Sequence, residues 1–155
     1  MIHGSIAELA AALAPRQRVL GLDVGTKTVG LAVSDSDLKV AAALDTIKRT
    51  KFSQDAETLQ RLIAERDVGG LVIGLPVSMD GTEGPAAQSV RQFAANLDAK
   101  LKDINIALWD ERLSTSAVQR FLVDEADMSR RRRAEVVDKM AATYILQGAL
   151  DSLKR

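Results

Sequence analysis

The chain has 155 residues, about the size of one domain, and its 46% apolar and 27% charged residues indicate an ordered globular protein. It has no cysteine and one histidine, His3, which excludes disulfides, thiol catalysis, zinc–cysteine sites and a serine–histidine triad. The 21 Lys and Arg residues balance the 21 Asp and Glu residues, so a nucleic-acid partner would have to be bound by a local basic patch.

Two further expectations follow from composition. No apolar run approaches the ~18 residues of a membrane span, and Glu8 interrupts the apolar stretch near the N-terminus, so a cytoplasmic protein without membrane contact is predicted. A bound metal would have to be held by oxygen ligands, which favours Mg²⁺, Mn²⁺ or Ca²⁺.

The first predicted element is a short amphipathic helix over residues 5–14. Ser5 and Glu8 have the spacing of a capping box at its start. We therefore divide the chain into a helical extension, residues 1–17, and a single domain, residues 18–155.

The domain is predicted to be an α/β fold with a five-stranded mixed sheet flanked by helices on both faces. In chain order the pattern predicts strands at 18–24, 28–34 and 40–47, a helix at 53–66 with Ser53 as N-cap, a strand at 71–75, a helix at 85–101, a strand at 104–109, and helices at 114–123 and 135–153. Three meandering strands followed by two right-handed crossovers produce such a sheet.

Three carboxylates lie where the predicted parallel strands end. Asp23 is near the end of the first strand, and Asp110 and Glu111 follow the last one. If the first, fourth and fifth strands are parallel neighbours, these groups meet at one edge, where open α/β sheets bind ligands. Asp23 stands in an otherwise apolar strand, so it needs either a partner such as a metal or the turn amides at Gly25.

A fourth carboxylate, Asp138, falls at the edge of the apolar face of the last helix, about 80° from its centre. With Asp23 and Glu111 it would form an acidic set suited to two Mg²⁺ or Mn²⁺ ions, which is the kind of site that hydrolyses phosphodiester bonds. An ordinary boundary residue is the alternative for Asp138.

Basic residues near these positions are candidate nucleic-acid contacts, with solvated surface charges as the alternative. They are Lys27, Arg112, Arg130, Arg131, Arg132, Arg133 and Lys139.

Several motifs, in this order, resemble the YqgF/RuvX family over residues 18–153. They are LGLDVGTK at 20–27, GLAVSD at 30–35, GLP at 74–76, MDGTEG at 79–84, DERLST at 110–115, VDKMAA at 137–142 and ILQ at 145–147. The resemblance implies an RNase H-like fold related to the Holliday-junction resolvase RuvC. It also implies a nuclease of 5′-end maturation of pre-16S ribosomal RNA.

Carried over by position, the catalytic residues would be Asp23, Glu111 and Asp138, with Asp110 as an alternative metal ligand to Glu111. Thr28 stands where many members have Arg. Structured RNA, branched DNA or a ribosomal particle would be the partner, and the protein would be a monomer or a weak homodimer.

Three other functions remain open from the sequence. One is a branched-DNA resolvase, and another is an RNA-binding ribosome-assembly factor without catalysis. The third is a fragment of a nucleotide-binding ATPase, because residues 23–26 resemble the phosphate-binding hairpin of actin-like ATPases.

Overall fold

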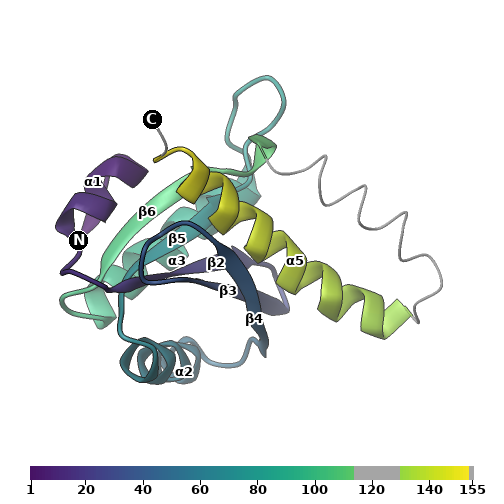
Figure 1. The fold of residues 1–155 in the computed structure, drawn as a ribbon. Coiled ribbons are helices and arrows are strands. Elements are labelled where there is room, and N and C mark those ends of the chain that lie inside the picture. The colour runs from purple at the N-terminus through teal and green to yellow at the C-terminus, as the bar shows by residue number, and fades with distance from the viewer. Residues whose placement is uncertain (114–129, 154–155) are drawn as a thin grey trace.

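A computed structural model describes the backbone of residues 1–113 and 130–153 and the side chains of residues 1–112 and 139–153. Its centre is a six-stranded sheet in the order β1-β6-β5-β2-β3-β4 (Figure 1). The strands are β1 (Ile2–His3), β2 (Arg18–Val24), β3 (Thr28–Ser34), β4 (Ala41–Lys48), β5 (Val68–Leu75) and β6 (Asn105–Asp110). The predicted helix at 114–123 lies outside the described residues.

Strands β1, β6, β5 and β2 are parallel to one another, and β3 and β4 continue the sheet as an antiparallel meander. The prediction that β2, β5 and β6 are parallel neighbours is confirmed. The sheet has one strand more than predicted, because Ile2 and His3 pair with Ile106 and Ala107 at the edge of β6. A two-residue strand is too short to leave a period-two signal in the sequence.

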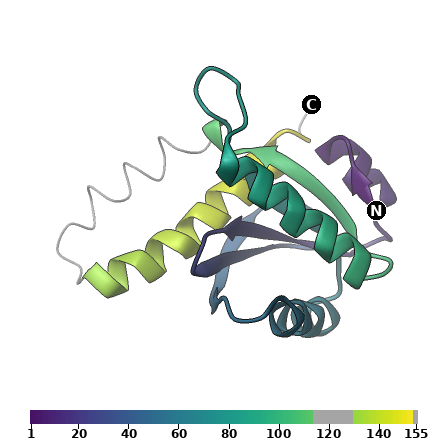
Figure 2. The same ribbon diagram turned by 180° about the vertical axis from the view of Figure 1, so that it is seen from behind.

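Helices cover both faces of the sheet, as predicted (Figures 1 and 2). They are α1 (Ile6–Ala12), α2 (Phe52–Glu65), α3 (Pro85–Lys100), the short η1 (Glu111–Leu113) and α5 (Arg130–Asp151). On one face Leu20, Leu22 and Ile73 pack with residues of α2 and α3. On the other face Val19 and Val72 pack with residues of α1 and α5. Each fully buried aliphatic side chain contributes about 1.5–3 kcal/mol of transfer free energy to these two cores.

The N-terminal ends of the first two helices show one case in which the local sequence predicts the cap residue correctly and one in which it does not. Ser5 caps α1 by accepting a hydrogen bond from the Glu8 amide at 3.1 Å, and the Glu8 carboxylate accepts from the Gly4 amide at 2.9 Å. The prediction of Ser53 as N-cap of the next helix was wrong, because α2 begins at Phe52 and its cap residue has no side-chain hydrogen bond.

The C-terminal helix is longer than predicted. It begins at Arg130 instead of residue 135, so the four consecutive arginines belong to its first turns and not to a preceding loop. Among the described residues, no helix combines the length and apolar character of a membrane span.

Candidate active site

The carboxylate of Asp23 lies on the α5 face of the sheet. Alternate residues of a strand share a face, and Gly21 lies two residues before Asp23 in β2. A Cβ atom on Gly21 would lie 2.7 Å from Leu146 Cβ and 3.0 Å from the carbonyl oxygen of Ala142, both in α5. The absence of a side chain at Gly21 therefore lets α5 pack closely against the strand that carries Asp23.

Glu111 reaches the same face from a different strand. It is the first residue of η1, directly after β6, and its side chain lies over Gly74 in β5. A Cβ on Gly74 would be 2.6 Å from Glu111 Oε1 and 2.5 Å from Ile145 Cδ1 of α5. Because Cβ contacts this short do not occur, a side chain at position 74 would force Glu111 or Ile145 to move from these positions.

A hydrogen bond joins the carboxyl groups of Glu111 and Asp23, and the pKa of Glu111 is raised from 4.5 to about 8. Burial of the Glu111 carboxyl is the largest cause, and the nearby charge of Asp23 is the second. Both effects disfavour a second negative charge, so near neutral pH the pair carries a proton on Glu111. Asp110 contributes a smaller increase.

Asp110 is engaged differently from its neighbour. It is the last residue of β6, and its carboxylate accepts hydrogen bonds from the Arg112 side chain, with Nη2 to Oδ2 at 2.6 Å and Nε to Oδ2 at 2.9 Å. It also accepts from the Arg112 backbone amide at 2.9 Å. The hydrogen bonds from the Arg112 side chain are the main cause of the lowered pKa of Asp110. The structure thus separates the two adjacent acids, one paired with Arg112 and the other with Asp23.

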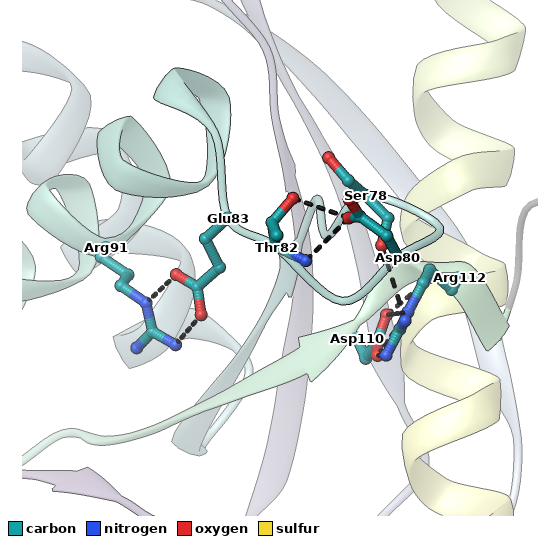
Figure 3. A network of polar contacts seen from close by, with 7 residues as sticks. All are labelled: Ser78, Asp80, Thr82, Glu83, Arg91, Asp110 and Arg112. Atoms are coloured by element: carbon teal, nitrogen blue, oxygen red, sulfur yellow. Dashed lines mark hydrogen bonds and ion pairs between the residues drawn. The ribbon is translucent and has the colours of Figure 1, made fainter.

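The loop after β5, residues 76–84, contacts this ion pair (Figure 3). Arg112 Nη1 donates to the carbonyl oxygen of Ser78 at 3.5 Å. Within the loop, the Asp80 carboxylate accepts from Thr82 Oγ1 at 2.7 Å and from the Thr82 amide at 3.0 Å, and these hydrogen bonds are the main cause of its lowered pKa. The loop is therefore connected to the end of β6 through Arg112.

A second ion pair fixes the far end of the loop. Arg91 of α3 binds Glu83 in a two-point contact of 2.6 and 2.7 Å. Between the two ion pairs is a pocket of 580 Å³, also lined by His3 and Leu108. The loop is thus held at one end by a bidentate arginine–carboxylate pair and at the other by the hydrogen bond from Arg112 to Ser78.

The remaining predicted site residues are Asp138 and the basic residues, and the structure describes the side chains of only some of them. Asp138 lies in α5, one helical turn before Ala142, and the carbonyl oxygen of Ala142 is near Gly21. The side chains of Asp138 and of the four arginines are outside the described residues. Lys139 is half-buried. Lys27 is exposed in the β2–β3 turn, where its carbonyl oxygen accepts from the Arg49 amide at 2.8 Å.

Sequence reasoning missed the two glycines that create the space for this site, Gly21 and Gly74. A signal was present, because a glycine inside an apolar strand often marks close approach of another element. It also missed Arg91, whose role depends on a contact between the loop and α3.

The donor set fits a hard divalent cation. Among the described residues, no group of three or more acidic or histidine side chains is in place to hold a metal. The pair of Asp23 and Glu111 supplies only oxygen donors, the ligands that Mg²⁺ and Mn²⁺ prefer. A cation at this pair would offset the repulsion that keeps a proton on Glu111.

Comparison with known proteins agrees with the family resemblance of the sequence motifs. The family described as RuvX, Holliday junction resolvase, matches residues 17–152. A protein of Paramagnetospirillum magneticum named "Putative pre-16S rRNA nuclease" is 66% identical over 146 residues, covering 94% of this chain and 93% of the relative. One of the same name from Rhodospirillum rubrum is 59% identical over 151 residues, covering 97% and 93%.

Two solved structures resemble this fold over most of the chain. Thermus thermophilus RuvC in complex with a Holliday junction substrate has a TM-score of 0.56 at 14% identity and covers 88% of this chain and 94% of its own. The Fowlpox virus resolvase bound to Holliday junction DNA has a TM-score of 0.52 at 10% identity, covering 90% and 100%. At such low identity the likeness shows the fold alone, and it confirms the predicted RNase H-like class.

Proposed function

Because the chain belongs to the RuvX family, we propose that it is a metal-dependent endonuclease that hydrolyses phosphodiester bonds in 5′-end maturation of pre-16S rRNA. The names of relatives at 66% and 59% identity support the substrate. The hydrogen-bonded pair of Asp23 and Glu111, at the end of the sheet where the parallel strands finish, is the observation that carries the chemistry.

Asp23 and Glu111 would hold the metal, Mg²⁺ or Mn²⁺, with Asp138 of α5 as a third ligand. The bound metal would supply Lewis-acid stabilisation of the charge that develops on the attacking and leaving oxygens. Asp110 is a weaker candidate ligand than Glu111, because Arg112 already occupies its carboxylate.

The chain's own residues would hold and orient the substrate. Arg112 keeps the loop after β5 close to the end of β6, and its guanidinium is a candidate phosphate contact at that edge. The remaining proposed phosphate contacts are Lys27, Arg130, Arg131, Arg132, Arg133 and Lys139. Placing positive charge beside an acidic site keeps the polyanion near the carboxylates that would otherwise repel it.

We further propose that residues 18–155 are one nuclease domain and that residues 1–17 are an extension of it. In this extension, Leu9 and Leu13 lie against Gly70 of β5, and His3 Nε2 is 2.8 Å from Asn105 Oδ1. The protein would act in the cytoplasm as a monomer or weak homodimer. Because the net charge is zero, a ribosomal particle would help to recruit it.

The deciding experiment is cleavage of a pre-16S RNA fragment by the wild type, Asp23→Asn and Asp37→Asn, each with Mg²⁺, Mn²⁺ or EDTA. Asp37 is an exposed carboxylate and provides a control for loss of one negative charge. We expect metal-dependent cleavage by the wild type and the control but not by Asp23→Asn. Cleavage that persists in EDTA or in Asp23→Asn would refute the proposed site.

A branched-DNA resolvase is the second candidate, because the matching family is described as a Holliday junction resolvase. A resolvase must cut two strands and therefore works as a dimer. A four-way DNA junction in the same assay, with light scattering to measure mass, distinguishes the two functions. Preferential junction cleavage by a dimer would favour the resolvase. Binding of RNA without cleavage of either substrate would favour a ribosome-assembly factor.

A further inference from the structure

A second polar pocket lies at the opposite ends of the strands from the carboxylate pair. Its volume is 400 Å³, within the ~300–1,000 Å³ that is typical of ligand sites. The polar residues that line it are Arg16, Arg18, Ser36, Glu65, Arg66 and Asp67. Arg18 begins β2 and Asp23 is five residues further on, so at ~3.3 Å per residue the pocket is roughly 17 Å from the proposed active site.

Three separate elements bring the arginines together. Arg16 lies in the connection between α1 and β2 with a left-handed φ of 69°, a conformation that few non-glycine residues adopt. The Arg18 amide donates to the carbonyl oxygen of Asp67 at 2.9 Å, which fixes the start of β2 beside β5. Arg66 is the C-cap residue directly after α2, and its amide donates to the carbonyl oxygen of Leu62 at 3.1 Å. The pocket is therefore built on hydrogen-bonded backbone at two of its three arginines.

Among the side chains that the structure describes, none forms an ion pair with these guanidinium groups. Within residues 1–112 and 139–153, neither Glu65 nor Asp67 comes within ion-pair distance of any of the three arginines. Arg66 Nε is buried, and no described residue provides it with a hydrogen-bond acceptor. Arg91 and Arg112, by contrast, are each held by a carboxylate at 2.6 Å.

The geometry points to a phosphate-binding site in this pocket, separate from the nuclease centre. Arginine is the side chain best matched to phosphate, because its planar N–H groups can bind two oxygens at once. The Ser36 hydroxyl adds a neutral donor, and the three arginines outweigh the two carboxylates. The phosphate would come either from the backbone of a nucleic acid, bound at a distance from the cleaved bond, or from a free phosphate ion.

Titration of the metal-free protein with inorganic phosphate tests the site itself. Arginine Nε–H signals in ¹⁵N-labelled protein report each guanidinium separately. We expect saturable shifts for Arg16, Arg18 and Arg66, and none for Arg61, an exposed arginine of α2 that does not line the pocket. Absence of saturable shifts at the three arginines, or equal shifts at Arg61, would overturn the proposal.

RNA binding distinguishes the two phosphate sources. Affinity of a pre-16S RNA fragment is measured in EDTA across a range of salt concentrations for the wild type, the combined R16Q/R18Q/R66Q variant, the single R16Q variant and the R61Q control. If one RNA phosphate occupies the pocket, the slope of log affinity against log salt falls by about 0.7–0.9 in the combined variant and not in R61Q.

An unchanged slope with phosphate shifts still present would assign the pocket to free phosphate. The exposed R16Q variant keeps the test valid if the combined variant loses its fold, which circular dichroism would show. Neither arm requires cleavage, so the result stands apart from that of the nuclease assay.

Discussion

The carboxyl groups of Glu111 and Asp23 are hydrogen-bonded to each other across β5, and Gly74 of β5 lacks the side chain that would block Glu111 from this position. One acid follows β6 and the other lies in β2, so the pair exists only because β5 stands between these strands in the sheet. The same gap over Gly74 receives Ile145 of α5. Docking of α5 and placement of Glu111 are thus coupled at a single residue.

Gly74→Ala is expected to displace Glu111 and to loosen α5. A new methyl group 2.6 Å from Glu111 Oε1 must push that side chain or Ile145 aside, at a cost of about 1–3 kcal/mol in stability. We expect cleavage to fall by about 10–100-fold and the Mg²⁺-induced rise in melting temperature to shrink. Gly84→Ala is the matched control, since a Cβ at Gly84 meets nothing within 4 Å. Equal activity in the two variants would contradict the role of Gly74.

The stability of the metal-free protein should depend on the proton held by Glu111. Its folded-state pKa, about 8, lies above the usual 4.5, so between these values folding takes up a proton and stability falls as pH rises. Allowing for partial solvent screening, we expect a loss of about 1–2 kcal/mol, or roughly 2–8 °C in melting temperature, between pH 5 and pH 8. Thermal unfolding in EDTA measures this loss. Glu111→Gln should remove this part of the pH dependence, and an unaltered profile would be evidence against the raised pKa.

Metal binding should show the opposite dependence on pH. A ligating carboxylate must be deprotonated, so Mg²⁺ has to displace the Glu111 proton. The rise in melting temperature at a fixed Mg²⁺ concentration should therefore be larger at pH 8 than at pH 6. Trp109, the one tryptophan of the chain, lies in β6 two residues before Glu111 and provides a fluorescence signal for the same titration. A metal effect independent of pH would place the cation elsewhere.

The two adjacent acids should respond differently to loss of charge. Glu111→Gln is expected to lower cleavage by at least about 100-fold, because it removes a proposed metal ligand. Asp110→Asn should lower it by about tenfold or less, through weaker attachment of Arg112 and of the loop at Ser78. Cleavage rates at saturating Mg²⁺ provide the comparison. A larger loss in Asp110→Asn would make Asp110 the metal ligand.

The order of the loop after β5 should also depend on the ion pair between Arg91 and Glu83. Arg91→Lys keeps the charge but loses the two-point contact with Glu83, which is the main cause of the lowered pKa of Glu83. We expect a small loss of stability and faster proteolysis within residues 76–84. Limited proteolysis followed by mass spectrometry measures this, with Arg61→Lys as a control on an exposed helix face.

Much of the architecture could be predicted because it depends on short-range patterns. The apolar stretch of β5, the hairpin of β2 and β3, and the capping residues of α1 are local features, and the structure has each of them. The N-terminus of α2 was misplaced because Asp55 accepts from the Thr50 amide and hydroxyl, a local arrangement that competes with capping by Ser53. The edge strand β1 depends on pairing with β6, a long-range contact that no local pattern reports.

The sequence by itself determined the order of the described strands and helices from β2 onwards, restricted the ligands of any metal to oxygen atoms, and singled out Asp23, Asp110 and Glu111 as candidates beside the sheet. These follow from residue type and periodicity, which are properties of the chain. Only the tertiary structure showed that the two neighbouring acids have different partners. Asp110 ends β6 and meets Arg112, whereas Glu111 begins η1 and its side chain reaches Asp23. The partner that each of these acids meets depends on the order of the strands and on the space above Gly74. Both arise only when distant parts of the chain pack together.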